Sequence, residues 1–264
     1  MTILKNLYQK VLRELWLFKH RGHDYSCPFC GYSSDTMLPF GQELAEEVKK
    51  DHIIGGGRRN VRCLKCGSHD RERLIYIYLR EIAHIFDSGK ETHLLHIAPE
   101  PRLSQALLKA GIDYVCGDLF TEGYTYPEYV RNMDVLHLPF EDNTFDIILC
   151  NHVLEHIPED RKAMQEIFRT LKPGGFSLLQ VPVSYLLEHT IEDFTIEDPH
   201  QREITFGQQD HCRLYGKDYI NRLQENGFEV EIVNISKEYA QFCLNPEENL
   251  FVCKKRLHPS DYFD

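Results

Sequence analysis

Apolar and charged residues alternate at helical spacing at the start of this 264-residue chain. Apolar residues recur every three or four positions from Leu4 to Phe18, and charged residues stand between them. This pattern predicts an amphipathic helix over residues 1–20 and differs from the uninterrupted apolar core of a signal peptide. We expect the helix to dock on the rest of the protein, and a position on a membrane surface is the alternative.

Residues 71–86 show a helical pattern. After them, short apolar runs alternate with amphipathic segments. The runs predict strands at 93–97, 114–116, 145–150, 176–181, 228–233 and 250–253, with helices near 101–110, 159–171 and 217–226. Strands that are apolar on both faces and alternate with helices form a parallel sheet covered on both sides. We therefore predict an α/β fold, with the last two strands as an antiparallel edge.

Two CxxC pairs, each followed by glycine, stand within residues 21–70: Cys27 with Cys30, and Cys63 with Cys66. Thiolates on two tight turns can converge on one tetrahedral Zn²⁺ ion. Four sulfur ligands leave no open position, so we expect a structural zinc. A redox pair or two unrelated pairs of buried thiols is the alternative.

These patterns divide the chain into a helix at 1–20, a zinc module at 21–70 and an α/β domain at 71–264. Within the domain, residues 184–213 show no regular strand pattern. Long irregular insertions in compact domains are commonly lids or binding loops. We expect this insertion to cover a substrate.

The segment from Asp134 to Val181 resembles the class I S-adenosylmethionine-dependent methyltransferases, specifically the ubiquinone and menaquinone methyltransferase group. The resemblance spans residues 92–182 and is carried by the order LPF, FD, a strand ending in NHVLEHI, and a helix closed by LKPGG. It implies a seven-stranded Rossmann-like sheet, S-adenosylmethionine as the cofactor and methyl transfer as the reaction.

Candidate cofactor contacts follow the strands of the expected sheet. Asp118 lies about 20 residues past the first strand, like the acid that accepts ribose hydroxyls in dinucleotide sites, and Leu119 follows it. The resemblance implies two further pairs of contacts: Asp134 and Val135 at the adenine, and Asn151 and His152 beside the methionine part.

The first motif departs from the family, because the usual glycine-rich turn reads LLHIAPEPRLS. His96 stands where an acid is usual, and Ala98 and Glu100 replace glycines. Pro101 suits the first turn of a helix, where Glu100 could act as cap and receive the cofactor's ammonium group. The missing glycines leave open a binding or scaffold protein that keeps the fold without the reaction.

The net charge of −11 disfavours nucleic acid as a partner, because such binding depends on neutralising phosphates. We expect a small-molecule or sugar-like acceptor, methylated on oxygen or nitrogen. The alternative is a ribosomal RNA base, favoured by a local concentration of basic residues: Arg58, Arg59, Arg62, Lys65, Arg71 and Arg73.

His211 follows the insertion and precedes a helix, so it could remove a proton from the acceptor, with Asp210 orienting it. A surface or packing histidine is the alternative, as is a second metal site formed with His189 and His200. An odd count of nine cysteines favours a reducing compartment, and no stretch approaches the roughly 18 apolar residues of a membrane span. We expect a cytoplasmic protein.

Overall fold

The computed structural model describes residues 2–87 and 92–257 of the chain. Within these ranges a seven-stranded sheet has the order β12-β13-β9-β8-β5-β6-β7. Its strands are β5 (His93–Ile97), β6 (Asp113–Asp118), β7 (Arg131–Asn132), β8 (Phe145–Asn151), β9 (Leu171–Gln180), β12 (Glu229–Val233) and β13 (Leu250–Lys254). The first five run parallel, whereas β13 is antiparallel to both β9 and β12.

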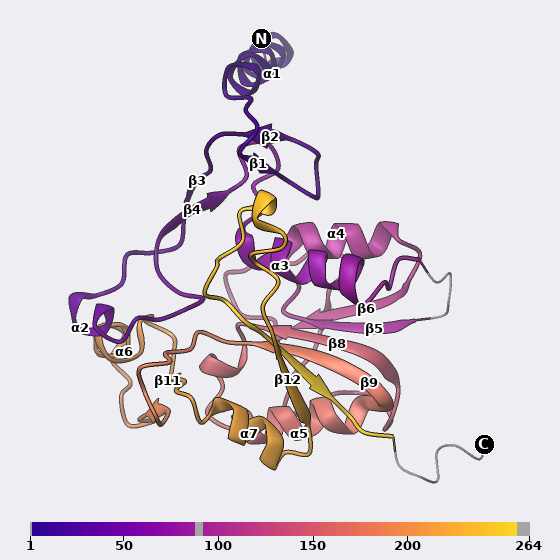
Figure 1. Ribbon diagram of the computed structural model, residues 1–264, viewed down its shortest axis with the longest axis vertical. Coiled ribbons are helices and arrows are strands. Elements are labelled where there is room, and N and C mark those ends of the chain that lie inside the picture. The colour runs from indigo at the N-terminus through magenta and orange to yellow at the C-terminus, as the bar shows by residue number, and fades with distance from the viewer. Residues whose placement is uncertain (1, 88–91, 258–264) are drawn as a thin grey trace.

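Helices cover both faces of the sheet (Figure 1). They are α3 (Asp70–Ile77), α4 (Pro101–Lys109), α5 (Asp160–Thr170) and α7 (Tyr219–Glu225). Successive residues of β5 point to opposite faces, so Leu94 packs with the α3 and α4 side and Leu95 with the α5 and α7 side. Both leucines are fully buried, and burying each side chain stabilises the fold by about 1.5–3 kcal/mol.

The predicted α/β fold is confirmed, and most predicted strands fall within a few residues of the observed ones. The helix predicted at 71–86 ends earlier, because α3 gives way to a π-helical turn, η1 (Tyr78–Ile82). Strand β9 begins at Leu171, before the predicted residue 176. The sequence did not predict β7, whose two residues are exposed and carry no apolar signal.

The N-terminal segment forms two small hairpins ahead of the sheet (Figure 1). One pairs β1 (Tyr25–Ser26) with β2 (Ser33–Ser34), and the other pairs β3 (Leu38–Phe40) with β4 (Arg59–Arg62). Between β3 and β4 the chain extends toward the main domain and forms the short helix α2 (Glu46–Lys49). A small core that includes Tyr32, Met37 and Leu64 supports the cysteines.

Helix α1 (Thr2–Lys19) is amphipathic, as predicted, and its second half contacts the N-terminal hairpins, where Arg13 donates to the carbonyl of Lys65 at 2.7 Å. Most of its apolar stripe is nevertheless left uncovered. The helix projects from the N-terminal hairpins (Figure 1), and its apolar side chains Leu7, Leu15 and Phe18 are 58–71% exposed. Leu17 is buried, and its carbonyl accepts a hydrogen bond from the Tyr32 hydroxyl at 2.6 Å. Among the described helices none is long and apolar enough to cross a bilayer.

The insertion at 184–213 is more regular than its sequence suggested. It contains β10 (Ile191–Glu192) and helix α6 (Pro199–Phe206), and β10 pairs with β11 (Arg213–Leu214). Asp198 caps α6 by accepting a hydrogen bond from the backbone N–H of Gln201 at 2.8 Å. The helix packs beside α2 of the N-terminal segment.

Candidate functional site

The strand order reverses at β5, which lies between β6 and β8. In open α/β sheets ligands bind outside the carboxyl ends of the strands at such a reversal. The loops after β5, β6 and β8 carry most of the predicted cofactor residues, and they meet at this edge of the sheet (Figure 1).

Ala98 shows how the chain turns after β5 without the usual glycine. Its φ of +50° lies in the left-handed region, and its N–H donates to the carbonyl of Gly117 at 2.8 Å. A non-glycine residue in this conformation costs about 1–2 kcal/mol. The backbone therefore makes the tight turn that the motif requires, at some cost in stability.

His96 and Glu100 interact with each other. His96 is fully buried, its Nε2 donates to the Glu100 carboxylate at 2.7 Å, and its Nδ1 lies 3.0 Å from the Tyr114 hydroxyl. Burial raises the pKa of Glu100, but the hydrogen bond and charge of His96, together with Arg71, outweigh burial and lower the pKa. Because both ring nitrogens have partners, His96 can act on a ligand only through Glu100.

Glu100 occupies the cap position of α4, but its carboxylate does not cap the helix. The cap comes instead from Glu72 of α3, which accepts a hydrogen bond from the backbone N–H of Arg102 at 3.0 Å. Pro101 begins the helix, as predicted. The carboxylate of Glu100 is therefore available to His96 and to a ligand bound beyond the turn.

Asp118 ends β6 with a half-buried side chain, and burial raises the pKa of its carboxyl. Leu119 is exposed beside it. Asp134 already accepts a hydrogen bond from the N–H of Leu136 at 2.8 Å, and Val135 is buried in the core. Each carboxylate thus interacts with one backbone N–H, that of Leu119 for Asp118 and that of Leu136 for Asp134, and keeps further lone pairs for a ligand.

Asn151 and His152 end β8 at the same edge. Asn151 is buried, and neither its amide nitrogen nor its amide oxygen has a hydrogen-bond partner among the described residues. His152 has a φ of +55°, and its N–H donates to the carbonyl of Gln180 at 2.7 Å. A buried amide without partners costs free energy, so Asn151 fits a site where a ligand supplies the missing hydrogen bonds.

Beyond His152 lies a cavity of about 300 Å³. Most of its lining comes from residues 40–57 of the N-terminal segment, the loop after β8 and the end of the insertion, and Arg59, Arg71 and Pro182 complete it. The bridge between Ile54 and Val183 holds the N-terminal segment against the domain. The N-terminal segment therefore supplies one side of the cavity.

A cluster of titratable side chains lines this cavity: His152, Glu155, His156 and His211. The Nδ1 of His152 lies 3.3 Å from a carboxylate oxygen of Glu155. The rings of His156 and His211 meet edge to face at a centroid distance of 4.7 Å. His211 thus lies in the cavity with the residues after β8, whereas His189 and His200 are exposed elsewhere on the insertion.

Burial acts on each of these groups. It lowers the pKa of His152 to about 4 and also lowers the pKa of His211. Burial raises the pKa of Glu155, but its interactions with His152, His156 and His211 together outweigh burial and lower the pKa to about 2. Burial also acts to lower the pKa of His156, but Asp210 and Glu155 outweigh it and raise that pKa. At neutral pH the cavity therefore holds the Glu155 carboxylate beside the neutral imidazoles of His152 and His211, with His156 as the histidine most easily protonated.

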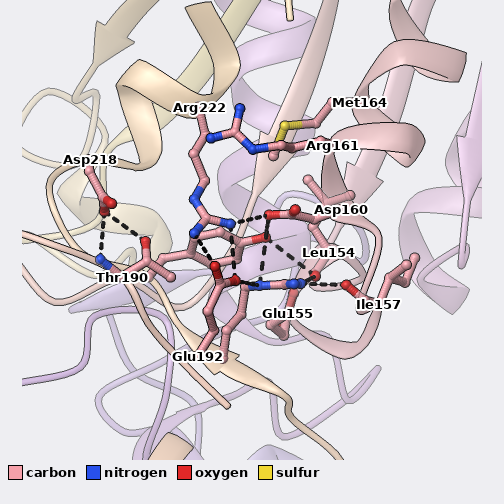
Figure 2. A network of polar contacts seen from close by, with 12 residues as sticks. Leu154, Glu155, Ile157, Asp160, Arg161, Met164, Thr190, Glu192, Asp218 and Arg222 are labelled. Carbon is pink, nitrogen blue, oxygen red and sulfur yellow. Dashed lines mark hydrogen bonds and ion pairs between the residues drawn. The ribbon is translucent and has the colours of Figure 1, made fainter. Parts of the chain in front are cut away.

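Arg213 fixes the loop that carries Glu155 and His156. Its partners Leu154, Asp160 and Glu192 are labelled in Figure 2. Its guanidinium is fully buried and donates to the carbonyls of Leu154 at 2.7 Å, Pro158 at 2.8 Å and Ile157. It also pairs with Asp160 and Glu192, which Arg222 shares. The strand after His211 thus locks the loop after β8.

The four cysteines of the CxxC pairs converge at one point, and their sulfur atoms lie within 4.8 Å of one another. The Cys27 and Cys66 sulfurs are 3.5 Å apart, and those of Cys30 and Cys63 are 3.8 Å apart. A tetrahedron with metal–sulfur bonds of about 2.3 Å has edges of about 3.8 Å. The four thiols therefore fit a single tetrahedral metal.

The basic residues near the second pair do not form one surface patch. Arg73 is fully buried and donates to the carbonyls of Val61 and Ser68 and of two residues in the η3 region (Ala240–Phe242). Arg59 pairs with the buried Asp70 at 3.0 Å, and Arg71 lines the cavity. Three of the six basic side chains are thus engaged inside the protein.

Residues 100–179 match a family described as a methyltransferase domain. The chain carries a class I methyltransferase domain. Members of this class use S-adenosylmethionine as the methyl donor. The seven-stranded Rossmann-like sheet that the resemblance implied is confirmed.

Individual relatives match short parts of the chain. An uncharacterized protein of Methanocaldococcus jannaschii is 48% identical over 66 residues, or 24% of this chain and 28% of that protein. A ubiquinone/menaquinone biosynthesis C-methyltransferase of Salmonella arizonae is 53% identical over 48 residues, or 18% of this chain and 19% of that enzyme. These alignments span less than a third of either relative.

Among solved structures, a SAM-dependent methyltransferase from Archaeoglobus fulgidus is similar to the methyltransferase domain. The similarity covers 70% of this chain and 94% of that chain, with a TM-score of 0.46 and 14% identity.

Sequence reasoning missed three features of the methyltransferase site: the roles of Glu155, His156 and residues 40–57. The first two had a signal, since His152, Glu155 and His156 are spaced to share one face of a helical turn within NHVLEHI. Residues 40–57 carry no such signal in the sequence, because this segment reaches the site only through tertiary packing.

Proposed function

We propose that the chain transfers the methyl group of S-adenosylmethionine to an oxygen or nitrogen of a small-molecule or sugar-like acceptor bound in the cavity beside His152. The observation that carries this proposal is the cavity itself, which adjoins the carboxyl end of β8 and is lined by polar side chains. A volume of about 300 Å³ suits a small ligand.

The residues at the edge of the sheet suit the cofactor. Asp118 would accept from the ribose hydroxyls, and Asn151 would pair its free amide with the methionine part. Leu119, Asp134 and Val135 would flank the adenine. His96 would orient Glu100 toward the ammonium group, and the turn at Ala98 would let the backbone approach.

When bound, the cofactor supplies an electrophilic methyl group on a sulfonium. The chain's own contribution is to position the acceptor and to remove its proton. Phe40 and Gly55 from the N-terminal segment, with Phe206 and His211 from the insertion, enclose the cavity. Enclosure aligns the reactants and excludes water, which are large contributions to rate in transfer reactions.

His211 remains our proposed base. Its Nδ1 donates to the carbonyl of Phe206 at 3.3 Å. A carbonyl only accepts, so this contact places the proton on Nδ1 and leaves the lone pair on Nε2. The acceptor's proton would pass to that nitrogen.

We also propose that the four thiols hold a structural Zn²⁺. The module they close carries residues 40–57 to the cavity, so zinc would stabilise the acceptor site indirectly. This arrangement makes the N-terminal module part of the enzyme's substrate-binding surface.

The ribosomal RNA alternative has less support. A base in a long anionic strand would need a broad basic surface around the cavity. Of the six basic residues only Arg59 and Arg71 line the cavity, and Arg59 is paired with Asp70. A compact neutral acceptor needs no such surface.

The test combines cofactor binding with product formation. Calorimetry should detect S-adenosylmethionine binding to the wild type, and Asp118→Ala should bind about tenfold or more weakly, because hydrogen bonds to a charged group contribute about 1.5–3 kcal/mol. A panel of polyols, sugars and amines should then be screened for release of S-adenosylhomocysteine. The proposal fails if the wild type does not bind the cofactor.

A further inference from the structure

The cluster in the cavity has a feature that a single general base does not explain. One ligand atom from each of Glu155, His156 and His211 lies within 4.8 Å of the other two. Glu155 is 1% exposed, and neither carboxylate oxygen has a well-formed hydrogen bond in the described part of the chain. Its polar neighbours are the Nδ1 of His152 at 3.3 Å and the Nε2 of His156 at 3.9 Å, both on one carboxylate oxygen. A buried carboxylate without hydrogen bonds is costly unless a cation compensates it.

In both His156 and His211 the Nδ1 already has an acceptor. The Nδ1 of His156 donates to Asp210, whose carboxylate and carbonyl oxygens each lie 3.3 Å away. The Nδ1 of His211 donates to the carbonyl of Phe206. Each histidine therefore keeps its Nε2 lone pair for another partner, and the Nε2 of His156 is 3.9 Å from Glu155.

Metal-binding histidines show this arrangement, in which one ring nitrogen donates to an oxygen and the other binds the metal. Two imidazoles and one carboxylate favour a first-row divalent ion such as Mn²⁺, Fe²⁺, Co²⁺ or Zn²⁺. Three protein ligands leave open positions on such an ion. The open positions would face the cavity.

The site is also held in place before any ion binds. The N–H of Cys212 donates to the carbonyl of Glu155 at 3.0 Å. Arg213 ties down the carbonyls on either side of Glu155 and His156. The segments that carry the three ligands are thus joined directly.

We propose that Glu155, His156 and His211 bind a divalent metal ion that holds and activates the methyl acceptor. This inference rests on the proposed function for its catalytic part, and it narrows the acceptor to a hydroxyl with a neighbouring oxygen donor, such as a vicinal diol. His211 then serves as a ligand in place of a base.

The reaction balances without further reagents. Two acceptor oxygens occupy the open positions, and coordination lowers the pKa of the hydroxyl as it does for bound water. The hydroxyl proton leaves to solvent, and the oxygen forms a bond to the methyl carbon. The sulfur–methyl bond breaks, and its electron pair stays on sulfur as S-adenosylhomocysteine.

Metal binding can be measured without cofactor or acceptor. Metals bound to the purified full-length protein are quantified first. Mn²⁺ is then added and its free signal followed by electron paramagnetic resonance, because Mn²⁺ competes poorly for thiolates. After subtracting the metal held by the four cysteines, the copurified metal and the bound Mn²⁺ should add up to one ion per chain.

Four variants, one of them a control, locate the ion. His211→Ala and Glu155→Gln should each weaken Mn²⁺ binding at least tenfold, whereas the control His200→Ala, exposed on the same insertion, should bind like the wild type. Asp210→Asn removes the carboxylate beside His156 but leaves the backbone carbonyl as an acceptor, so it should bind about tenfold more weakly. Thermal melts show whether each variant is folded. If Glu155→Gln unfolds, the test rests on His211→Ala, which keeps the buried carboxylate of Glu155.

The outcomes separate the two proposals. A wild type without this second ion, or variants that bind it equally well, overturns the metal site. Full methyl transfer after the ion is removed also overturns it, and leaves His211 as the base. An ion that binds as expected in a protein that transfers no methyl group supports the site and defeats the proposed function.

Discussion

Replacing Arg213 by methionine should destabilise the protein by about 3–5 kcal/mol. The guanidinium satisfies the carbonyls of Leu154, Ile157 and Pro158 in a buried position, and an unsatisfied buried acceptor costs about 1–3 kcal/mol. Arg222 still pairs with Asp160 after the change, which limits the loss to the range measured for removing one member of a buried pair.

The assay is urea unfolding followed by circular dichroism. A matched control is Arg161→Ala, because the pair of Arg161 with Glu225 is about half exposed on both sides, and such pairs contribute less than about 1 kcal/mol. Arg213→Lys should fall between the two, because lysine keeps the charge but loses the planar fork of donors. If Arg213→Met is no less stable than Arg161→Ala, the network does not hold the loop as we argue.

Two further predictions concern the N-terminal module and its contact with the domain. Protein made without chelators should contain one zinc ion for the four-cysteine site, and Cys63→Ser/Cys66→Ser should lose it, as elemental analysis can show; retention by the double variant would contradict the site. Burial and the adjacent Asp70 raise the pKa of Glu248 to about 7, against the opposing effect of Arg59 and Arg71. A carboxyl whose folded pKa is raised loses stability as pH rises from its unfolded value of about 4.3 to about 7. The free energy of unfolding of Glu248→Gln, taken relative to the wild type, should therefore increase from pH 5 to pH 7 by up to about 3 kcal/mol. A difference between the two proteins that stays constant over this pH range would refute the prediction.

The sheet could be predicted because its strands are apolar on both faces. β5 and β8 contain almost unbroken runs of buried residues, and periodicity detects such runs directly. The same reasoning failed for β7, which is short and exposed, and for α6, whose segment PHQREITF lacks an apolar stripe. Helix α1 has such a stripe, but a stripe does not specify what covers it.

The part of the candidate site that local spacing encodes could be predicted. The spacing of the two cysteine pairs predicts that they converge at one point, as they do. The ribose contact of Asp118 stays a prediction from its distance past the first strand. Glu100 was misplaced as a helix cap because its neighbour His96 and the competing cap Glu72 meet it only in three dimensions. The cavity wall at residues 40–57 depends on contacts across more than a hundred residues, which no local pattern encodes.

Those distant contacts also set the order in which the protein can be assembled during synthesis. The hydroxyl of Ser184 donates to the carbonyl of Asp51, 133 residues earlier in the chain. At about 5–20 residues per second, the ribosome needs about 7–27 s to produce the second partner after the first. Cys27 and Cys66 are only 39 residues apart. The four cysteines can therefore come together early, whereas the carbonyl of Asp51 cannot accept its hydrogen bond until Ser184 has been synthesised. A nascent chain halted near residue 180 would carry the cysteines and the cofactor edge of the sheet, but no enclosed cavity for an acceptor.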